Sequence, residues 1–338
     1  MKFATYLNLQ DEKRAGFFID NELYDLKDSA TKAGIELPSD MLSFLRESDV
    51  NYSKARDLEQ IIKNSNEFQS VEPVKLLSPI PNPPSVRDGY AFRQHVAAAR
   101  KNRGVDMIPE FDQYPIFYFT NHTAVFGEGD IIVEKDHLEK CDFELEWAAV
   151  IGKSGKNIQS SEADDYIFGY TIFNDFSARL LQMEEMKLNL GPAKGKDFAS
   201  SFGPILITKD ELQEVSVPTE FGMNYNLEMK AYHNGEQISS GNTKDMNWTF
   251  AEIIERASYG VELQPGDIIG SGTVGTGCYL ELNGTRAREA KERGDDYTPV
   301  WLKSGDDITL EIEKIGILKN RIVLSDNNVS ILAKKKNG

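Results

Sequence analysis

The chain has 338 residues, 40% of them hydrophobic, which suits about two domains with a sizeable buried core. Acidic residues outnumber basic ones 54 to 38, and the formal net charge of −16 argues against binding to nucleic acid or to an anionic membrane. The sequence shows no signal-peptide pattern and no apolar run long enough to span a membrane, so we expect a cytoplasmic protein.

The first third of the chain predicts a small α/β domain. Alternating apolar residues predict a β-hairpin with strands over 1–9 and 14–26, and residues 38–66 have the apolar spacing of a helix. A proline-rich run over 79–84 follows, and such a run is typical of a stiff linker. We therefore expect an N-terminal domain over 1–78, a linker over 79–84, a main domain over 85–330 and a disordered tail over 331–338.

The main domain is predicted to consist mostly of strands. It opens with a helix expected over 88–103, and a second helix is expected over 249–258. Strand-like runs lie at 116–119, 131–133, 143–151, 166–173, 205–208, 227–232, 268–273, 279–282 and 308–315. Regular alternation of strand and helix is missing, so the sequence predicts an α+β, mainly β fold rather than a doubly wound one. Cys141 and Cys278 fall in or beside these runs and are expected to be free, buried thiols.

Residues 270–275 match the spacing G-x-G-x-x-G that some dinucleotide-binding sites use. That site needs a helix after the glycines, because the helix N-terminus faces the pyrophosphate. Residues 276–282 have the alternation of a strand, so we do not expect nucleotide binding here. The glycines are expected to form a tight turn or the wall of another site.

Two glutamates on one predicted strand suggest a cation site. Glu144 and Glu146 point the same way from a strand with apolar residues on both faces, and their Cα atoms are expected about 6.5–7 Å apart. Burying two carboxylates without compensation costs several kcal/mol, and a divalent cation would compensate both. An arginine partner for one glutamate, or a glycosidase carboxylate pair, are the alternatives.

Further acids and a histidine join this pattern. Asp175 lies where a predicted strand runs into a helix, so it is either a helix N-cap or a third ligand. Asp88 and His95 are seven residues apart on a predicted helix and would share a face, about 10.5 Å apart along the axis. Asp88 could then reach an ion while His95 reaches a substrate. A set of carboxylate oxygens suits Mg²⁺, Ca²⁺ or Mn²⁺ and not zinc.

Five blocks in chain order resemble the fumarylacetoacetate hydrolase family. The blocks are RDGYAFRQH at 87–95, DFELE at 142–146, NDFSARLLQ at 174–182, GPAKGKDF at 191–198 and GSGT through LEL at 270–282. The resemblance covers roughly residues 75–320. It implies a mixed β-sandwich roll for the catalytic domain, joined here to the small N-terminal α/β domain, and usually a homodimer.

The resemblance also implies roles for single residues. The expected metal ligands are Glu144, Glu146 and Asp175, with Asp88 added in the hydrolase branch of the family. The expected catalytic residues are His95, Glu281, which holds it from a predicted strand, and Lys196. The expected substrate-contacting residues are Tyr90, Arg179, Gln182, Tyr118 and Thr273.

The implied activity is metal-dependent hydrolysis of a carbon–carbon bond in a β-diketo acid, such as fumarylacetoacetate or an acylpyruvate, in aromatic amino-acid catabolism. The cation would stabilise the leaving enolate while His95 takes a proton from water. Lys196 and Gln182 would stabilise the oxyanion, and Arg179 and Tyr90 would hold a substrate carboxylate. The alternatives are a decarboxylase or isomerase of a related 2-keto acid, or a non-catalytic module stabilised by its cation.

Overall fold

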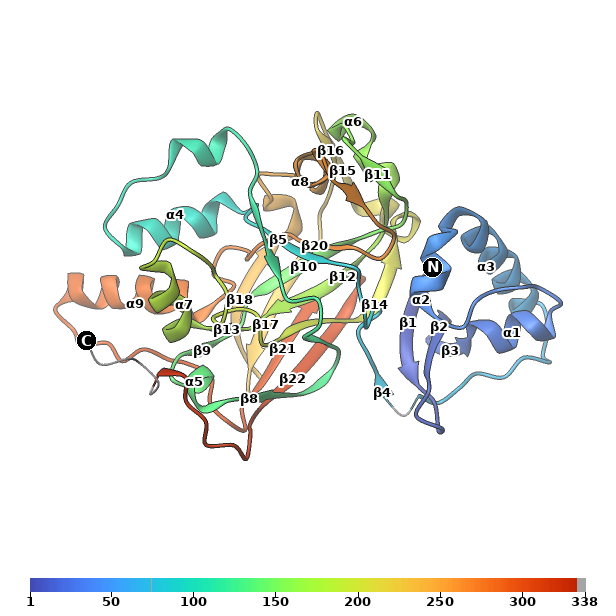
Figure 1. The fold of residues 1–338 in the computed structure, drawn as a ribbon, viewed down its shortest axis with the longest axis horizontal. Helices are drawn as coiled ribbons and strands as arrows, with labels where there is room; N and C mark the ends of the chain where they lie inside the picture. Colours follow the sequence, from blue (N-terminus) through green and yellow to red (C-terminus); the bar gives the residue numbers. More distant parts are fainter. Residues whose placement is uncertain (74, 333–338) are drawn as a thin grey trace.

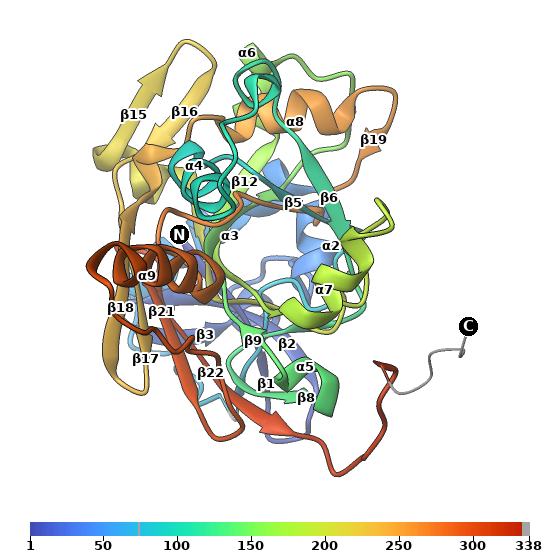
Figure 2. The ribbon, with the colours of Figure 1, turned by 90° about the vertical axis from the view of Figure 1, so that its left-hand side faces the viewer.

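Two β-sheets form the body of the protein, as the computed structural model shows for residues 1–73 and 75–332 (Figures 1 and 2). The larger sheet has 11 strands. Its path runs β3 (Glu22–Asp25), β2 (Lys13–Ile19), β1 (Lys2–Leu7), β14 (Ser200–Thr208), β12 (Ile167–Asp175), β10 (Leu145–Ile151), β20 (Ile268–Gly270), β5 (Val86–Gly89) and β6 (Phe117–Thr120). Off this path, β4 (Lys75–Leu76) pairs with β1, and β7 (Val125–Phe126) pairs with β14.

The second sheet packs against the first across one apolar core. Its strand order is β18 (Glu236–Asn242), β17 (Glu228–His233), β21 (Asp307–Ile312), β22 (Gly316–Leu324) and β8 (Gly129–Val133). Strands β12 and β14 contact β21 and β22, and the shared core joins Trp147 and Ile172 of one sheet to Leu310 and Ile322 of the other. Trp147 stacks on Tyr170 with ring centroids 4.8 Å apart. The predicted α+β, mainly β fold is confirmed.

Short strand pairs and helices complete the fold. The pairs are β9 (Cys141–Asp142) with β13 (Ser177–Ala178), β11 (Gly155–Lys156) with β19 (Glu262–Leu263), and β15 (Ser216–Thr219) with β16 (Gly222–Tyr225). The α-helices are α1 (Leu26–Lys32), α2 (Met41–Arg46), α3 (Ser48–Lys63), α4 (Arg93–Asn102), α5 (Lys135–Leu138), α6 (Ser160–Ala163), α7 (Arg179–Met186), α8 (Phe250–Ser258) and α9 (Tyr279–Arg293). Short 3₁₀ helices are η1 (Pro109–Asp112), η2 (Asp164–Tyr166), η3 (Lys209–Val215) and η4 (Thr243–Asp245).

The N-terminal segment has the predicted hairpin, although the strand expected over 14–26 is two antiparallel strands, β2 and β3. The sheet of this segment continues into the main body. Phe3 of β1 pairs with Leu206 of β14, so the two parts share one sheet. The helix expected over 38–66 is two helices, α2 and α3. The proline run packs against its neighbours: Thr5 Oγ1 donates to the carbonyl of Pro79 at 2.7 Å, and Ile80 is buried. The proposed domain boundaries stay a prediction.

Two segments near the predicted site differ from expectation. Asp88 was expected on a helix with His95, but it lies in β5, which pairs with both β20 and β6, and α4 begins only at Arg93. Residues 279–282 were expected to be a strand, but they open α9. A four-residue alternation fits a helix start equally well, and the helix is favoured because Asp142 accepts the first backbone N–H groups, at Tyr279 and Leu280.

A helix therefore does follow the glycines of 270–275, although not directly. Its N-terminus is occupied by the Asp142 carboxylate, which accepts from Tyr279 N at 2.7 Å and from Leu280 N at 2.9 Å. A pyrophosphate would have to displace this buried carboxylate. Nucleotide binding at these glycines thus has no support from the fold.

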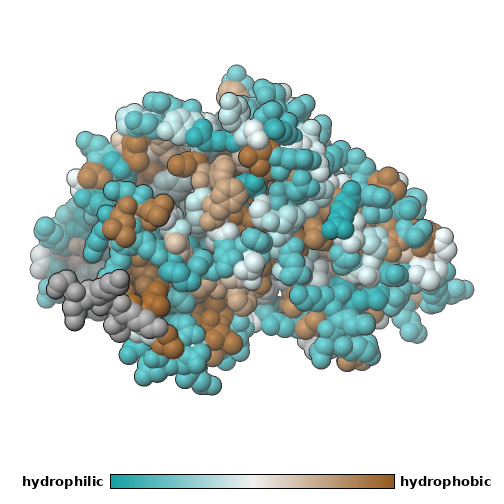
Figure 3. Space-filling model, viewed as in Figure 1, coloured by the Kyte–Doolittle hydropathy of each residue, from teal (hydrophilic) through white to brown (hydrophobic). Residues whose placement is uncertain are grey.

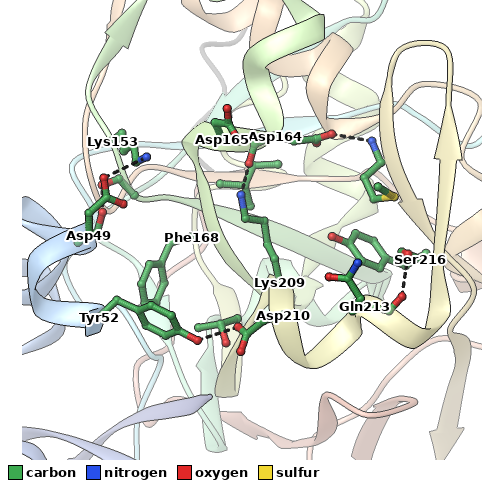
Figure 4. A pocket seen from close by; sticks show the side chains of 16 residues that line it. Asp49, Tyr52, Lys153, Asp164, Asp165, Phe168, Lys209, Asp210, Gln213 and Ser216 are labelled. Atoms are coloured by element: carbon green, nitrogen blue, oxygen red, sulfur yellow. Dashed lines mark hydrogen bonds and ion pairs between the residues drawn. The ribbon is translucent and has the colours of Figure 1, made fainter. Parts of the chain in front are cut away.

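The surface in Figure 3 is mostly hydrophilic, with apolar side chains in separate small groups. A cavity of about 470 Å³ lies where α3 meets β12, β14 and η3, and Figure 4 shows Tyr52, Phe168 and Lys209 among its walls. None of its lining residues is a predicted site residue.

Within 1–73 and 75–332, the structure contains no helix long and apolar enough to cross a membrane. Residues 331 and 332 donate backbone N–H groups to Asp136, and the rest of the predicted tail, 333–338, lies outside the described residues.

Candidate active site

The four acids predicted from the sequence lie together on or beside neighbouring strands of the larger sheet. Asp88 lies in β5, Glu146 in β10 and Asp175 at the end of β12, and Glu144 directly precedes β10. These strands are near neighbours in the sheet, with only β20 between β10 and β5. Oxygen atoms of the four carboxylates lie within 4.8 Å of one another, and all four side chains are buried. We call these four residues the carboxylate cluster.

Two buried cations compensate one side of the carboxylate cluster. Lys196 Nζ donates to Glu144 Oε2 and, at 2.6 Å, to Asp175 Oδ2. Arg179 Nη2 donates to Glu144 Oε1 at 2.7 Å. Burial would raise the pKa of Glu144, but the charges of Lys196 and Arg179 hold it below its ordinary value. Burial also raises the pKa of Asp175, to about 6, because Lys196 offsets only part of this effect.

The other side of the carboxylate cluster has more acidic groups than buried cations to compensate them. Burial, then the charge of Asp175, raises the pKa of Asp88 to about 8. Burial and the charge of Asp88 raise the pKa of Glu146 well above its ordinary value. Glu146 Oε2 and Asp175 Oδ1 are buried and have no hydrogen-bond partner among the described residues. Unpartnered carboxylate oxygens that converge in this way fit a hard divalent cation, so the four residues could hold one.

We expect Mn²⁺ or Mg²⁺ to raise the melting temperature, and to do so more at pH 8 than at pH 5. With the pKa of Asp88 raised from 3.8 to about 8, the folded metal-free protein keeps a proton that the unfolded chain has released. The free energy of unfolding of the metal-free protein should therefore fall as the pH rises between these values. A cation that replaces the proton binds better as the pH rises.

This expectation can be checked by thermal unfolding with and without the cation. At a cation concentration 100 times Kd the stabilisation is about 2.7 kcal/mol, or about 4 °C for a chain of this length. KCl at matched ionic strength is the control. An equal shift at both pH values, or none, would contradict a cation site at the carboxylate cluster.

A histidine–glutamate pair lies beside the carboxylate cluster. His95 of α4 and Glu281 of α9 are both buried, and His95 Nδ1 is 2.5 Å from Glu281 Oε2. Because Glu281 is an acceptor, it assigns the proton to Nδ1 and leaves Nε2 as the free base. The backbone N–H of Thr276 donates to Glu281 Oε1 at 3.0 Å and fixes the carboxylate. His95 also lies near enough to the carboxylate cluster that a positive charge on its ring, once protonated, would lower the pKa of Glu144.

The remaining predicted site residues surround these two groups. Tyr118 of β6 donates to Asp175 Oδ2, and Thr273 Oγ1 donates to Glu146 Oε1 at 3.3 Å. Gln182 of α7 accepts from Arg179 Nη1 at 3.0 Å. The ring of Tyr90 packs edge-on against His95 with centroids 6.0 Å apart. Arg179, Lys196 and Tyr118 thus bond to protein carboxylates or amides, and Tyr90 lies next to the expected base.

Two glycines of the motif at 270–275 form a wall of the carboxylate cluster. A Cβ at Gly270 would lie 2.4 Å from Asp88 Oδ1, so a larger residue would displace that carboxylate. Gly272 has φ +77° and its N–H donates to Asp88 Oδ1 at 3.1 Å. These two glycines therefore lie against the carboxylate cluster, as expected for the wall of a site.

Residues 85–323, more than half of the chain, match the family described as fumarylacetoacetate (FAA) hydrolase C-terminal. The chain belongs to this family. Among curated members, the oxaloacetate tautomerase YisK of Bacillus subtilis is 34% identical over 95% of this chain and 100% of its own length. The oxaloacetate tautomerase FAHD2A of human mitochondria is 29% identical over 85% of this chain and 81% of its own length.

Two solved structures share the fold of this chain. A fumarylacetoacetate hydrolase from Exiguobacterium antarcticum has a TM-score of 0.67 at 23% identity and covers 96% of this chain and all of its own. A maleylpyruvate hydrolase from Sphingobium, solved with manganese(II) and pyruvate, has a TM-score of 0.66 at 20% identity over the same shares. At these identities the likeness shows the fold alone.

The structure assigns roles to two residues that had none in the sequence analysis. Asp142 was part of the DFELE block, but its contact with the N-terminus of α9 spans 137 positions and leaves no local pattern. Thr276 acts through its backbone N–H, which any residue other than proline provides. The two cysteines are free and buried, as predicted.

Proposed function

We propose that the chain interconverts the keto and enol forms of oxaloacetate or a closely related 2-keto dicarboxylic acid, with a divalent cation held by the carboxylate cluster. The observation that carries this proposal is the His95–Glu281 pair, oriented at 2.5 Å beside four buried acids. The 34% identity with a tautomerase over its whole length supports the same reaction.

Tautomerisation needs one proton carrier and consumes no water. His95 Nε2 would take a proton from the methylene carbon next to the keto group, and the C–H electron pair becomes the C=C bond of the enolate. The same imidazolium then gives the proton to the enolate oxygen, so no atom is lost or gained. Glu281, which accepts from Nδ1, stabilises the imidazolium between the two transfers.

The carboxylate cluster would hold Mg²⁺ or Mn²⁺ through Asp88, Glu144, Glu146 and Asp175. When bound, the cation supplies Lewis-acid stabilisation for the negative charge that develops on the keto oxygen. Lys196 contributes to the same electrostatic stabilisation from its place between Glu144 and Asp175. We assign substrate orientation to Tyr90, because its ring contacts His95 directly.

The hydrolase activity expected from the family resemblance has less support. It needs a water molecule placed for attack in addition to the base, and the curated relatives described above are named tautomerases. The isomerase alternative therefore fits better.

The test is to follow enol decay of oxaloacetate by ultraviolet absorbance, with product analysis by NMR, with and without Mn²⁺. Fumarylacetoacetate, acylpyruvates and maleylpyruvate are assayed in parallel. Faster equilibration with no change in composition supports the tautomerase. Formation of pyruvate from oxaloacetate indicates a decarboxylase, and cleavage of a diketo acid with no effect on oxaloacetate would overturn the proposal in favour of a hydrolase.

A further inference from the structure

Asp142, a buried aspartate outside the carboxylate cluster, links this cluster to the helix that carries the partner of His95. Asp142 is fully buried and accepts four hydrogen bonds. Its Oδ1 accepts from the N–H of Tyr279 at 2.7 Å and of Phe143 at 2.9 Å, and its Oδ2 accepts from Leu280 N at 2.9 Å and Arg179 Nε at 2.8 Å. Helix α9 and Arg179 therefore share one carboxylate.

On one side, Asp142 fixes the start of α9. The residue at the N-cap position, Cys278, makes no side-chain hydrogen bond to the helix, so Asp142 satisfies the N–H groups of the first two helical residues instead. A negative charge at this end of a helix is also favoured by the helix dipole. The third helical residue is Glu281, whose position over His95 therefore depends on this contact.

On the other side, Asp142 fixes Arg179, and through it a residue of the carboxylate cluster. The same guanidinium that donates to Asp142 donates from Nη2 to Glu144 at 2.7 Å. Arg179 and Glu144 are both buried, where water cannot replace a lost partner. The contacts thus run unbroken from Glu144 through Arg179 and Asp142 to the helix that carries Glu281.

We propose that Asp142 is a positioning residue that couples cation binding at the carboxylate cluster to the orientation of Glu281 and His95. A cation that draws Glu144 into its coordination also fixes Arg179, and Asp142 transmits this to the first turn of α9. The proposal deepens the proposed function and rests on it only where turnover is measured.

A second buried aspartate offers a matched control. Asp25 accepts from Arg14 Nε at 2.9 Å and Nη2 at 2.7 Å, and from the N–H of Asp28 at 2.7 Å, so it also pairs an arginine with a helix N-terminus. It lies in the N-terminal segment and bonds to no residue of the carboxylate cluster. A purely structural role for Asp142 predicts that the two aspartates behave alike.

Hydrogen exchange of the wild-type protein tests the coupling without a variant. Saturating Mn²⁺ is expected to slow exchange at the amides of Tyr279 and Leu280 on the order of tenfold, with no change at Asp28 or at Glu252, which is capped in α8. Unchanged exchange at Tyr279 and Leu280, with Mn²⁺ binding shown by calorimetry, would overturn the proposal whatever the protein's substrate.

The variants Asp142→Asn and Asp25→Asn give the second test. Asp142→Asn is expected to weaken Mn²⁺ binding on the order of tenfold and to lower kcat by a similar factor, with KM within about twofold. Asp25→Asn should lower the melting temperature and leave Mn²⁺ binding and kcat unchanged. Wild-type Mn²⁺ affinity in folded Asp142→Asn contradicts the coupling. If wild type turns over none of the substrates, the proposed function fails, while the exchange and binding results still decide the role of Asp142.

Discussion

Replacing His95 with alanine is expected to lower kcat for oxaloacetate tautomerisation by about 10²–10⁴-fold, the usual contribution of a positioned acid–base residue. The loss should be large because the same imidazole both removes and returns the proton. Mn²⁺ affinity should stay near the wild-type value, since His95 bonds to Glu281 and to none of the four acids. Stopped-flow measurement of enol decay and calorimetric titration of Mn²⁺ give the two quantities.

The exposed His122 provides the matched control, and His122→Ala should keep wild-type kcat. Glu281→Gln should have an intermediate effect, because the amide still holds the ring in place but stabilises the imidazolium less. Near wild-type turnover in His95→Ala would exclude His95 as the base and with it the proposed proton path. Loss of Mn²⁺ binding in the same variant would instead mean that His95 supports the carboxylate cluster.

The strand period predicted that Glu144 and Glu146 face the same side, whereas Asp88 was added through a helix that the structure does not contain, and the full set of ligands followed from the family resemblance. Glu144 and Glu146 are two positions apart, so they had to face the same side, and the structure places both beside Asp88 and Asp175. Several predicted runs, such as 143–151 and 166–173, fall on observed strands, because their apolar residues are bounded by turn residues, whereas β18 and β22 of the second sheet were not predicted. Strand period and apolar runs depend on residues close together in the chain, so they can be predicted from the sequence.

The parts that were missed depend on contacts between distant segments. Asp88 was placed on a helix because the residues after it have helical spacing, but pairing with β20, some 180 positions later, makes its segment a strand. The alternating run at the start of α9 predicts a strand, but so short a run fits a helix equally well, and the deciding contact is the distant Asp142. Tertiary hydrogen bonds overrode local propensity in both places.

Replacing Glu146 with glutamine is expected to weaken Mn²⁺ binding on the order of 100-fold, about 2.7 kcal/mol, while the metal-free protein becomes no less stable. The two expectations differ because Glu146 is expected to be neutral without the cation and charged when it binds one. Burial and the nearby Asp88 raise the pKa of Glu146 well above its ordinary value, which favours the neutral carboxyl group in the metal-free protein. A neutral carboxyl group is close in shape and charge to an amide. A bound cation needs the carboxylate, which glutamine cannot supply.

Glu59→Gln in α3 is the matched control, because Glu59 is also buried but pairs with Lys63 at 2.8 Å, far along the chain from the carboxylate cluster. Its loss should lower the melting temperature slightly and leave Mn²⁺ binding unchanged. Comparison of Glu59→Gln with Glu146→Gln distinguishes an acid that stabilises the fold from an acid that binds a cation. If Glu146→Gln bound Mn²⁺ like wild type, Glu146 would not be a ligand. If Glu146→Gln strongly destabilised the metal-free protein, the Glu146 carboxylate would already be charged and compensated without a cation, and the shortage of compensating cations inferred for this side of the carboxylate cluster would be wrong.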